Sequence, residues 1–146
     1  FSTDMYDVHD YTQDAEKLKS YLAPMLNDPN YVHNPIHQEQ LKKNVYTGQP
    51  YWMSEYGGIF WNSELKPGEK GWGYGVGPKS REEFLSRYEG LTVTLLNNPE
   101  HMGFCYTQLT DIEQEQNGVY NYDRTPKFSE SELKNIFLQK TDWSKF

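Results

Sequence analysis

The order of hydrophobic patterns along this 146-residue chain predicts an α/β fold built on a parallel sheet. Strand-like runs alternate with helix-like periodic runs, two of the helix-like runs begin with a capping signal, and long loops follow two of the strand-like runs. Three strands cannot close a (β/α)8 barrel, which takes about 250 residues. If the architecture is a barrel, the chain therefore holds fewer than half of its strands.

The first strand and helix are predicted before residue 27. The run Thr3 to Tyr11 alternates two sets of side chains, as a strand does, and it places His9 and Tyr11 on one face. The run Asp14 to Leu26 has apolar residues at helical spacing and acidic residues early, which predicts a helix that Pro24 helps to end.

The stretch Pro50 to Trp61 joins an aromatic strand-like run to one carboxylate and a pair of glycines. The pair Gly57-Gly58 breaks the strand pattern directly after Glu55. Glu55 is therefore expected at the carboxyl end of a strand, where parallel α/β architectures carry catalytic groups. The local pattern leaves open an ordinary carboxylate in a loop salt bridge.

The connection from Asn62 to Lys79 is long and contains five glycines, two prolines, Trp72 and Tyr74. Because long loops without periodicity are usually functional or disordered, the aromatic residues favour a mobile aromatic lid over an inert linker. Ser80 then begins a helix with a capping-box pattern and an apolar stripe.

The last third of the chain predicts one more strand and one more helix. Gly103 to Leu109 has a strand-like composition, and the acidic loop Asp111 to Gln116 follows it. A second cap signal at Ser129 predicts a last helix that ends near Gln139.

Three residues with metal-binding or nucleophilic side chains have simpler interpretations. His33 and His37 lie four apart in a proline-broken loop, so we expect exposed loop histidines rather than a metal site. Cys105, the single cysteine, lies in an apolar run, which favours a buried small side chain over a nucleophile.

Composition narrows the class of partner. The formal net charge is -7 and the basic residues are scattered, so nucleic acid is not an expected partner. No apolar run is long enough to span a bilayer, so no membrane role is expected. The aromatic share is 16%, and aromatic side chains with wet edges are typical of sugar-binding clefts. No cofactor and no metal are predicted.

Three segments in order resemble the catalytic barrel of glycoside hydrolase family 2, the family of β-galactosidases, β-glucuronidases and β-mannosidases. They are YDVHDY at Tyr6 to Tyr11, SEYGG at Ser54 to Gly58, and GFCYTQLTDIEQEQNGVYNYDRTPK at Gly103 to Lys127. The resemblance covers essentially the whole chain. It implies that residues 1–146 are a single segment, the C-terminal part of a (β/α)8 barrel with strands six to eight, their helices and long βα loops.

The resemblance also implies roles for individual residues. Glu55 matches the nucleophile of a retaining β-glycosidase, and Tyr11 matches the tyrosine that hydrogen-bonds it. His9 falls where relatives carry an active-site polar residue, which binds a sugar hydroxyl or satisfies a neighbour. Tyr106 falls near the tryptophan that floors the sugar site, and the change to tyrosine leaves that role open. The other residues expected to contact substrate are Tyr56, Trp61, Trp72 and Gln108.

The chain departs from the family pattern at two places. The acid/base glutamate of the family follows an asparagine, and no glutamate directly follows an asparagine here. The uronate-binding lysine motif of β-glucuronidases is replaced by Glu115-Gln116-Asn117, which favours a neutral hexoside such as a β-galactoside.

The expected function is therefore that of one segment of a glycosidase. We expect it to depend on the remaining barrel strands of a longer protein or to self-associate, and to be inactive by itself. The alternative is a non-catalytic carbohydrate-binding or structural module derived from such a barrel.

Overall fold

The computed structural model describes residues 3–35, 45–142 and 144. Three parallel strands form one sheet, in the order β1 (Tyr6–Asp10), β2 (Tyr51–Gly57) and β3 (His101–Thr107). The helices are α1 (Ala15–Leu22), which a 3-10 turn η1 (Ala23–Leu26) extends, α3 (Arg81–Asn97) and α4 (Glu130–Phe137). The predicted α/β class and parallel sheet are confirmed.

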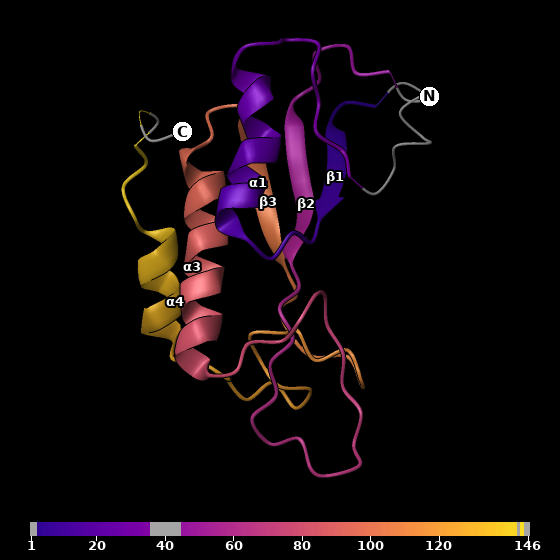
Figure 1. Ribbon diagram of the computed structural model, residues 1–146, viewed down its shortest axis with the longest axis vertical. Coiled ribbons are helices and arrows are strands. Elements are labelled where there is room, and N and C mark those ends of the chain that lie inside the picture. Colours follow the sequence, from indigo (N-terminus) through magenta and orange to yellow (C-terminus); the bar gives the residue numbers. More distant parts are fainter. Residues whose placement is uncertain (1–2, 36–44, 143, 145–146) are drawn as a thin grey trace.

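The helices and the long loops occupy different parts of the sheet. In Figure 1 the helices lie on one side of the sheet, and the loops that follow β2 and β3 gather beyond the carboxyl ends of the strands. The side chains at the carboxyl ends of the strands are therefore surrounded by loops.

None of the helices in the described part of the chain has the length and apolar character that crossing a bilayer requires.

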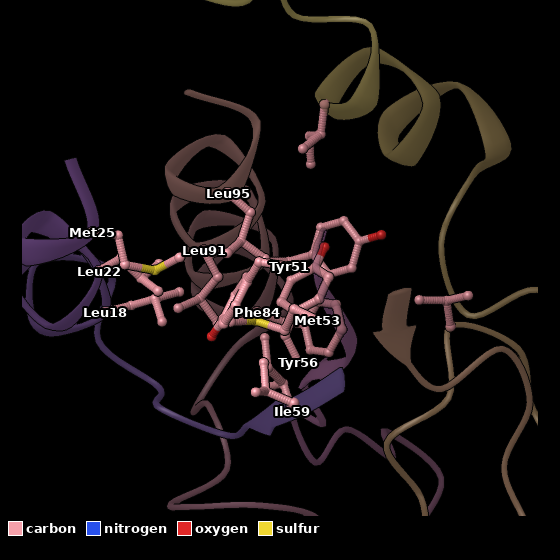
Figure 2. Close-up of a cluster of buried hydrophobic side chains, with 14 of the residues drawn as sticks. Leu18, Leu22, Met25, Tyr51, Met53, Tyr56, Ile59, Phe84, Leu91 and Leu95 are labelled. Atoms are coloured by element: carbon pink, nitrogen blue, oxygen red, sulfur yellow. The ribbon is translucent and has the colours of Figure 1, made fainter. Parts of the chain in front are cut away.

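The core fills the space between the sheet and the helices. Met53 and Tyr56 of β2 are fully buried, as are Phe84 and Leu91 of α3. Figure 2 shows these side chains gathered with others from α1 and η1. Aromatic rings replace the aliphatic residues that the chain lacks: Phe84 stacks on Phe128, with ring centroids 4.3 Å apart.

Side-chain caps begin the helices, two of them at the predicted residues Ser80 and Ser129 and one at Asp14. The side chain of Asp14 accepts the backbone N–H of Lys17 at 2.9 Å, and Ser129 with Glu132 forms a complete capping box. Ser80 accepts the N–H of Glu83 at 3.2 Å, but the carboxylate of Glu83 accepts the N–H of Lys79 rather than that of Ser80. The pattern at Ser80 therefore predicts the helix start correctly and only half of the box.

A β-bulge in β2 decides which side chains face the helices. Val8 of β1 lies opposite Met53, but the next residue, His9, lies opposite Glu55, so Ser54 is skipped. Simple alternation after the buried Met53 would turn Glu55 into the core and Tyr56 away from it. The extra residue reverses both orientations, which is a known effect of bulges near active sites.

Two predictions about single residues are wrong. His33 is not an exposed loop residue: it is 9% exposed, and its Nε2 lies 2.7 Å from Oδ2 of the buried Asp10. Cys105 is exposed rather than buried, because it lies on an edge strand of the sheet, on the face opposite the helices. His37, the other loop histidine, lies outside the described residues.

Candidate active site

Glu55 lies at the carboxyl end of the central strand and is partly open to solvent. Its side chain is 36% exposed, and its Oε2 accepts a hydrogen bond from the hydroxyl of Tyr11. Nδ1 of His9 lies 3.8 Å from the same oxygen. The structure therefore brings together three of the residues that the sequence nominates, from the ends of two neighbouring strands.

The glycine pair after Glu55 is required by backbone conformation and by close packing. Gly57 has φ +79° and Gly58 has φ +58°, which side-chain-bearing residues rarely adopt. A Cβ on Gly57 would lie 2.5 Å from the ring of Tyr106, and one on Gly58 would lie 2.4 Å from the ring of Tyr74. The pair therefore lets two aromatic rings approach the backbone next to the carboxylate.

Tyr74 is a site residue to which the sequence reasoning gave no role of its own. Its ring lies parallel to that of Tyr11, with centroids 3.4 Å apart and planes 2° apart. Burial and the hydrogen bonds to Glu55 and Tyr74 raise the pKa of Tyr11, so the phenol remains a donor at neutral pH. The available signal was the glycine on each side of Tyr74, because glycines often mark a close approach of backbone to another group.

Trp72 extends this aromatic group toward solvent. Its ring makes an angle of 75° with that of Tyr74, with centroids 5.8 Å apart, and the residue is 48% exposed. Tyr11, Tyr74 and Trp72, called here the aromatic wall, run from the Glu55 carboxylate to the surface. The exposed ring of Trp72 is able to stack on the apolar face of a pyranose.

Three of the predicted substrate contacts point into the core instead. Tyr56 is fully buried and shares a hydrogen bond with Thr92 of α3, because the bulge in β2 turns it toward the helices. Tyr106 lies opposite Tyr56 in the sheet, and its hydroxyl accepts the N–H of Ile59 at 3.0 Å and donates to the carbonyl of Asn117 at 3.2 Å. Trp61 packs against the core, with its ring 6.4 Å from that of Phe84.

Gln108, the remaining predicted contact, lies at the end of β3 but not beside Glu55. It lines a groove of about 360 Å³ between the loop after β3 and α4, together with Leu109, Val119 and Leu133. Its backbone carbonyl accepts the N–H of Val119 at 3.1 Å. The structure therefore places Gln108 on the α4 side of the strand end.

The glycine-rich loop is anchored, which differs from the predicted mobile lid. The N–H of Trp72 donates to the carbonyl of Gln114 at 2.8 Å, and its carbonyl accepts the N–H of Gln116 at 2.8 Å. The N–H of Tyr74 donates to the carbonyl of Gly58, also at 2.8 Å. These backbone bonds tie the loop after β2 to the acidic loop after β3, so the aromatic wall stands on a fixed support.

A buried ion pair holds together the loop after β2 and the loop after β3. Nζ of Lys127 lies 2.7 Å from Oδ1 of Asp111, and both side chains are about 5% exposed or less. The ammonium also donates to the carbonyls of Trp61 at 2.6 Å and Gln116 at 3.4 Å. Burial lowers the pKa of Lys127, while the hydrogen bond to Asp111 opposes that shift.

The described part of the chain offers no metal site. Over residues 3–35, 45–142 and 144, no three His, Cys, Asp or Glu side chains are grouped in a way that could hold a metal ion. The chemistry that the described groups offer is that of one carboxylate with an oriented phenol donor.

Comparison with known proteins gives a likeness in structure. No family model and no curated protein sequence matches the chain. A β-glucuronidase of Bifidobacterium dentium, solved with coumarin-3-O-glucuronide, aligns with 92% of this chain at a TM-score of 0.56 and 17% identity. A β-glucuronidase of Faecalibacterium prausnitzii aligns with 98% of this chain at a TM-score of 0.53 and 16% identity. The chain spans only 20% and 22% of these two proteins, so it shares its fold with a part of each.

Proposed function

We propose that this chain is the C-terminal part of the catalytic barrel of a retaining β-glycosidase of family 2, with Glu55 as the nucleophile. The observation that carries the proposal is the hydrogen bond from Tyr11 to the Glu55 carboxylate at the carboxyl end of the central strand. Such a donor fixes the direction of the carboxylate's lone pairs. A carboxylate oriented in this way suits attack on an anomeric carbon.

The proposed reaction has two steps, of which this chain supplies one participant. An oxygen of Glu55 bonds to the anomeric carbon while the bond to the leaving oxygen breaks, and a glycosyl ester forms. Water then attacks the same carbon and releases Glu55. A second carboxyl group, roughly 5 to 5.5 Å from the first, must protonate the leaving oxygen and then deprotonate the water.

The second carboxyl group is proposed to come from outside this chain. Of the two glutamates in the acidic loop, Glu115 accepts a hydrogen bond from Asn117 at 3.2 Å and pairs through its backbone with Trp72. Glu113 is exposed at the tip of that loop. Because the matched β-glucuronidases are about five times longer, strands one to five of the proposed barrel would lie in the rest of a longer protein.

A neutral β-hexoside is the proposed substrate class, although both matched structures are β-glucuronidases. A uronate requires a cation, and the buried Lys127 in this loop region already bonds Asp111 and two carbonyls. The side chain of Asn117, at the position of the family's uronate-binding motif, is buried, and its amide donates to Glu115. Hydroxyl-binding groups such as His9 and the exposed ring of Trp72 suit an uncharged sugar.

Substitution of the nucleophile in the longer protein that contains this segment tests the proposal. Glu55→Ala should reduce turnover of an aryl β-glycoside by several orders of magnitude while sugar binding survives. Azide should partly restore the rate with an activated substrate, because it fits the vacated space, and the product should be a glycosyl azide of inverted configuration. Glu113→Ala, which changes a nearby exposed carboxylate, is the matched control and should stay active.

The outcomes separate the two classes of function. Normal turnover of Glu55→Ala would show that Glu55 is not the nucleophile. If the longer protein has no turnover and the substitution alters only sugar affinity, the non-catalytic carbohydrate-binding module is the better account. Hydrolysis by the purified 146-residue chain, abolished by Glu55→Gln, would show that a second acid lies within the chain.

A further inference from the structure

Tyr74 acts on Glu55 indirectly, through its contact with Tyr11. The flat stack of the two rings covers one face of the Tyr11 phenol, whose hydroxyl donates to the carboxylate. The ring of His9 lies at 70° to that of Tyr11, with centroids 6.3 Å apart. Two neighbouring side chains therefore limit how the Tyr11 ring can rotate, and Tyr74 makes the closer contact.

Tyr74 is itself held by features with no other evident use. Its N–H is bonded to the carbonyl of Gly58, and its ring lies where any side chain on Gly58 would collide with it. The next residue, Gly75, has φ +68° and packs against Gln13. The side-chain amide of Gln13 donates to the carbonyls of Gly57 and Tyr11. Gln13 therefore links the backbone at the end of β1 to the backbone at the end of β2.

We infer that Tyr74 is a positioning residue for the nucleophile, which acts by fixing the ring of Tyr11 so that its hydroxyl stays directed at Glu55. The inference rests on the proposed function for its catalytic meaning, but the contact itself exists in this chain without turnover. It also explains why the loop after β2 is anchored at residues 72 and 74: a displaced loop would leave Tyr11 free to rotate.

The ionisation of Tyr11 provides a direct readout. The titratable groups that act on the Tyr11 phenol are Glu55, Tyr74 and, beside its ring, His9. Burial is the largest cause of the raised pKa of Tyr11, and the Tyr74 ring supplies part of that burial. Loss of the stack should therefore bring the Tyr11 pKa down toward the ordinary tyrosine value of about 10.

The test uses the 146-residue chain with ¹³C at the tyrosine ζ carbons, titrated by NMR from about pH 8 to 12. Tyr11→Phe assigns the signal. Tyr11 should remain protonated to the upper end of this range in the wild type, and in Tyr74→Phe, which keeps the ring but loses the hydroxyl, it should titrate later than in Tyr74→Leu. In Tyr74→Leu, and in Gly58→Ala, which places a Cβ against the Tyr74 ring, Tyr11 should titrate at least one pH unit earlier than in the wild type.

Two controls distinguish positioning from general damage. Tyr51 and Tyr56 have pKa values raised by burial elsewhere in the core, so their continued resistance to titration shows that a variant is folded. Tyr122→Leu makes the same substitution at an exposed tyrosine of the neighbouring loop and should leave Tyr11 unchanged. A wild-type titration of Tyr11 in folded Tyr74→Leu would overturn the inference.

Activity in the longer protein then tests the catalytic meaning separately. Tyr74→Leu should lower kcat at least tenfold with little change in KM, and Tyr74→Phe should restore most of kcat. An altered Tyr11 titration without glycosidase activity in the wild type would refute the proposed function and leave the contact intact. An altered titration with unchanged kcat would refute the positioning role alone.

Discussion

The buried pair between Asp111 and Lys127 should dominate the stability of the loops that carry the aromatic wall. Removing one partner of a buried ion pair costs about 3–5 kcal/mol, because a charge stays behind without compensation. After Asp111→Ala the ammonium keeps the carbonyls of Trp61 and Gln116, which favours the lower end of that range. After Lys127→Met the carboxylate keeps, among the described residues, one hydrogen bond from the N–H of Gly118 at 2.9 Å, which favours the upper end.

A double-mutant cycle measured by urea unfolding at neutral pH tests this reasoning. The double variant Asp111→Ala/Lys127→Met buries no charge, so it should lose less stability than either single variant. The coupling free energy should be about 2 kcal/mol or more. Glu64→Ala, at an exposed carboxylate of the loop after β2, is the control and should change the free energy of unfolding by about 0.5 kcal/mol or less.

The cycle also has a result that would refute the reasoning. If Lys127→Met costs no more than Glu64→Ala, the pair does not support the loops. The same conclusion follows if the effects of the two single substitutions simply add. All variants should be compared at one protein concentration, because self-association would add to apparent stability.

Three further predictions follow from other parts of the structure. Burial lowers the pKa of His101 to about 4, so as the pH falls the unfolded chain protonates His101 before the folded chain does. About 3 kcal/mol of stability should therefore be lost as the pH falls from 6.5 through 4. His101→Leu should flatten this pH dependence in acid-unfolding curves. Gly57→Ala should destabilise the chain more than Gly68→Ala, because both have positive φ but only the former places a Cβ against a ring; equal midpoints of thermal unfolding would contradict this. The purified chain should self-associate, because both edge strands of the sheet are unpaired in the described part of the chain; a monodisperse monomer in sedimentation would count against it.

Most of the fold could be predicted because its signals are local. Apolar periodicity and the caps at Ser80 and Ser129 locate the helices to within a few residues, and the pattern around Glu55 locates the end of the central strand. These signals depend on neighbours in the sequence. They require no knowledge of which elements meet in space.

The errors occurred where long-range contacts decide. Cys105 is exposed because its side chain lies on the face of the sheet opposite the helices, and a single strand pattern does not reveal which face other elements will cover. His33 is buried because it bonds Asp10, a partner 23 residues away. Tyr74 lies in a loop without periodicity, so only its approach to Tyr11 in three dimensions shows its importance.

The bulge at Ser54 has a consequence for how change in this strand would be tolerated. Tyr51 and Met53 occupy odd positions in the strand, whereas Tyr56 occupies an even one, so the change of parity is visible in the sequence itself. Deleting Ser54 would restore an unbroken strand. Tyr56 would still face the helices and Glu55 would still face away, because Glu55 would remain opposite His9 and Tyr56 opposite Asp10. Substitution or deletion of Ser54 should therefore leave the carboxylate beside its phenol donor, whereas deletion of the paired residue Trp52 would slip the register of the strand.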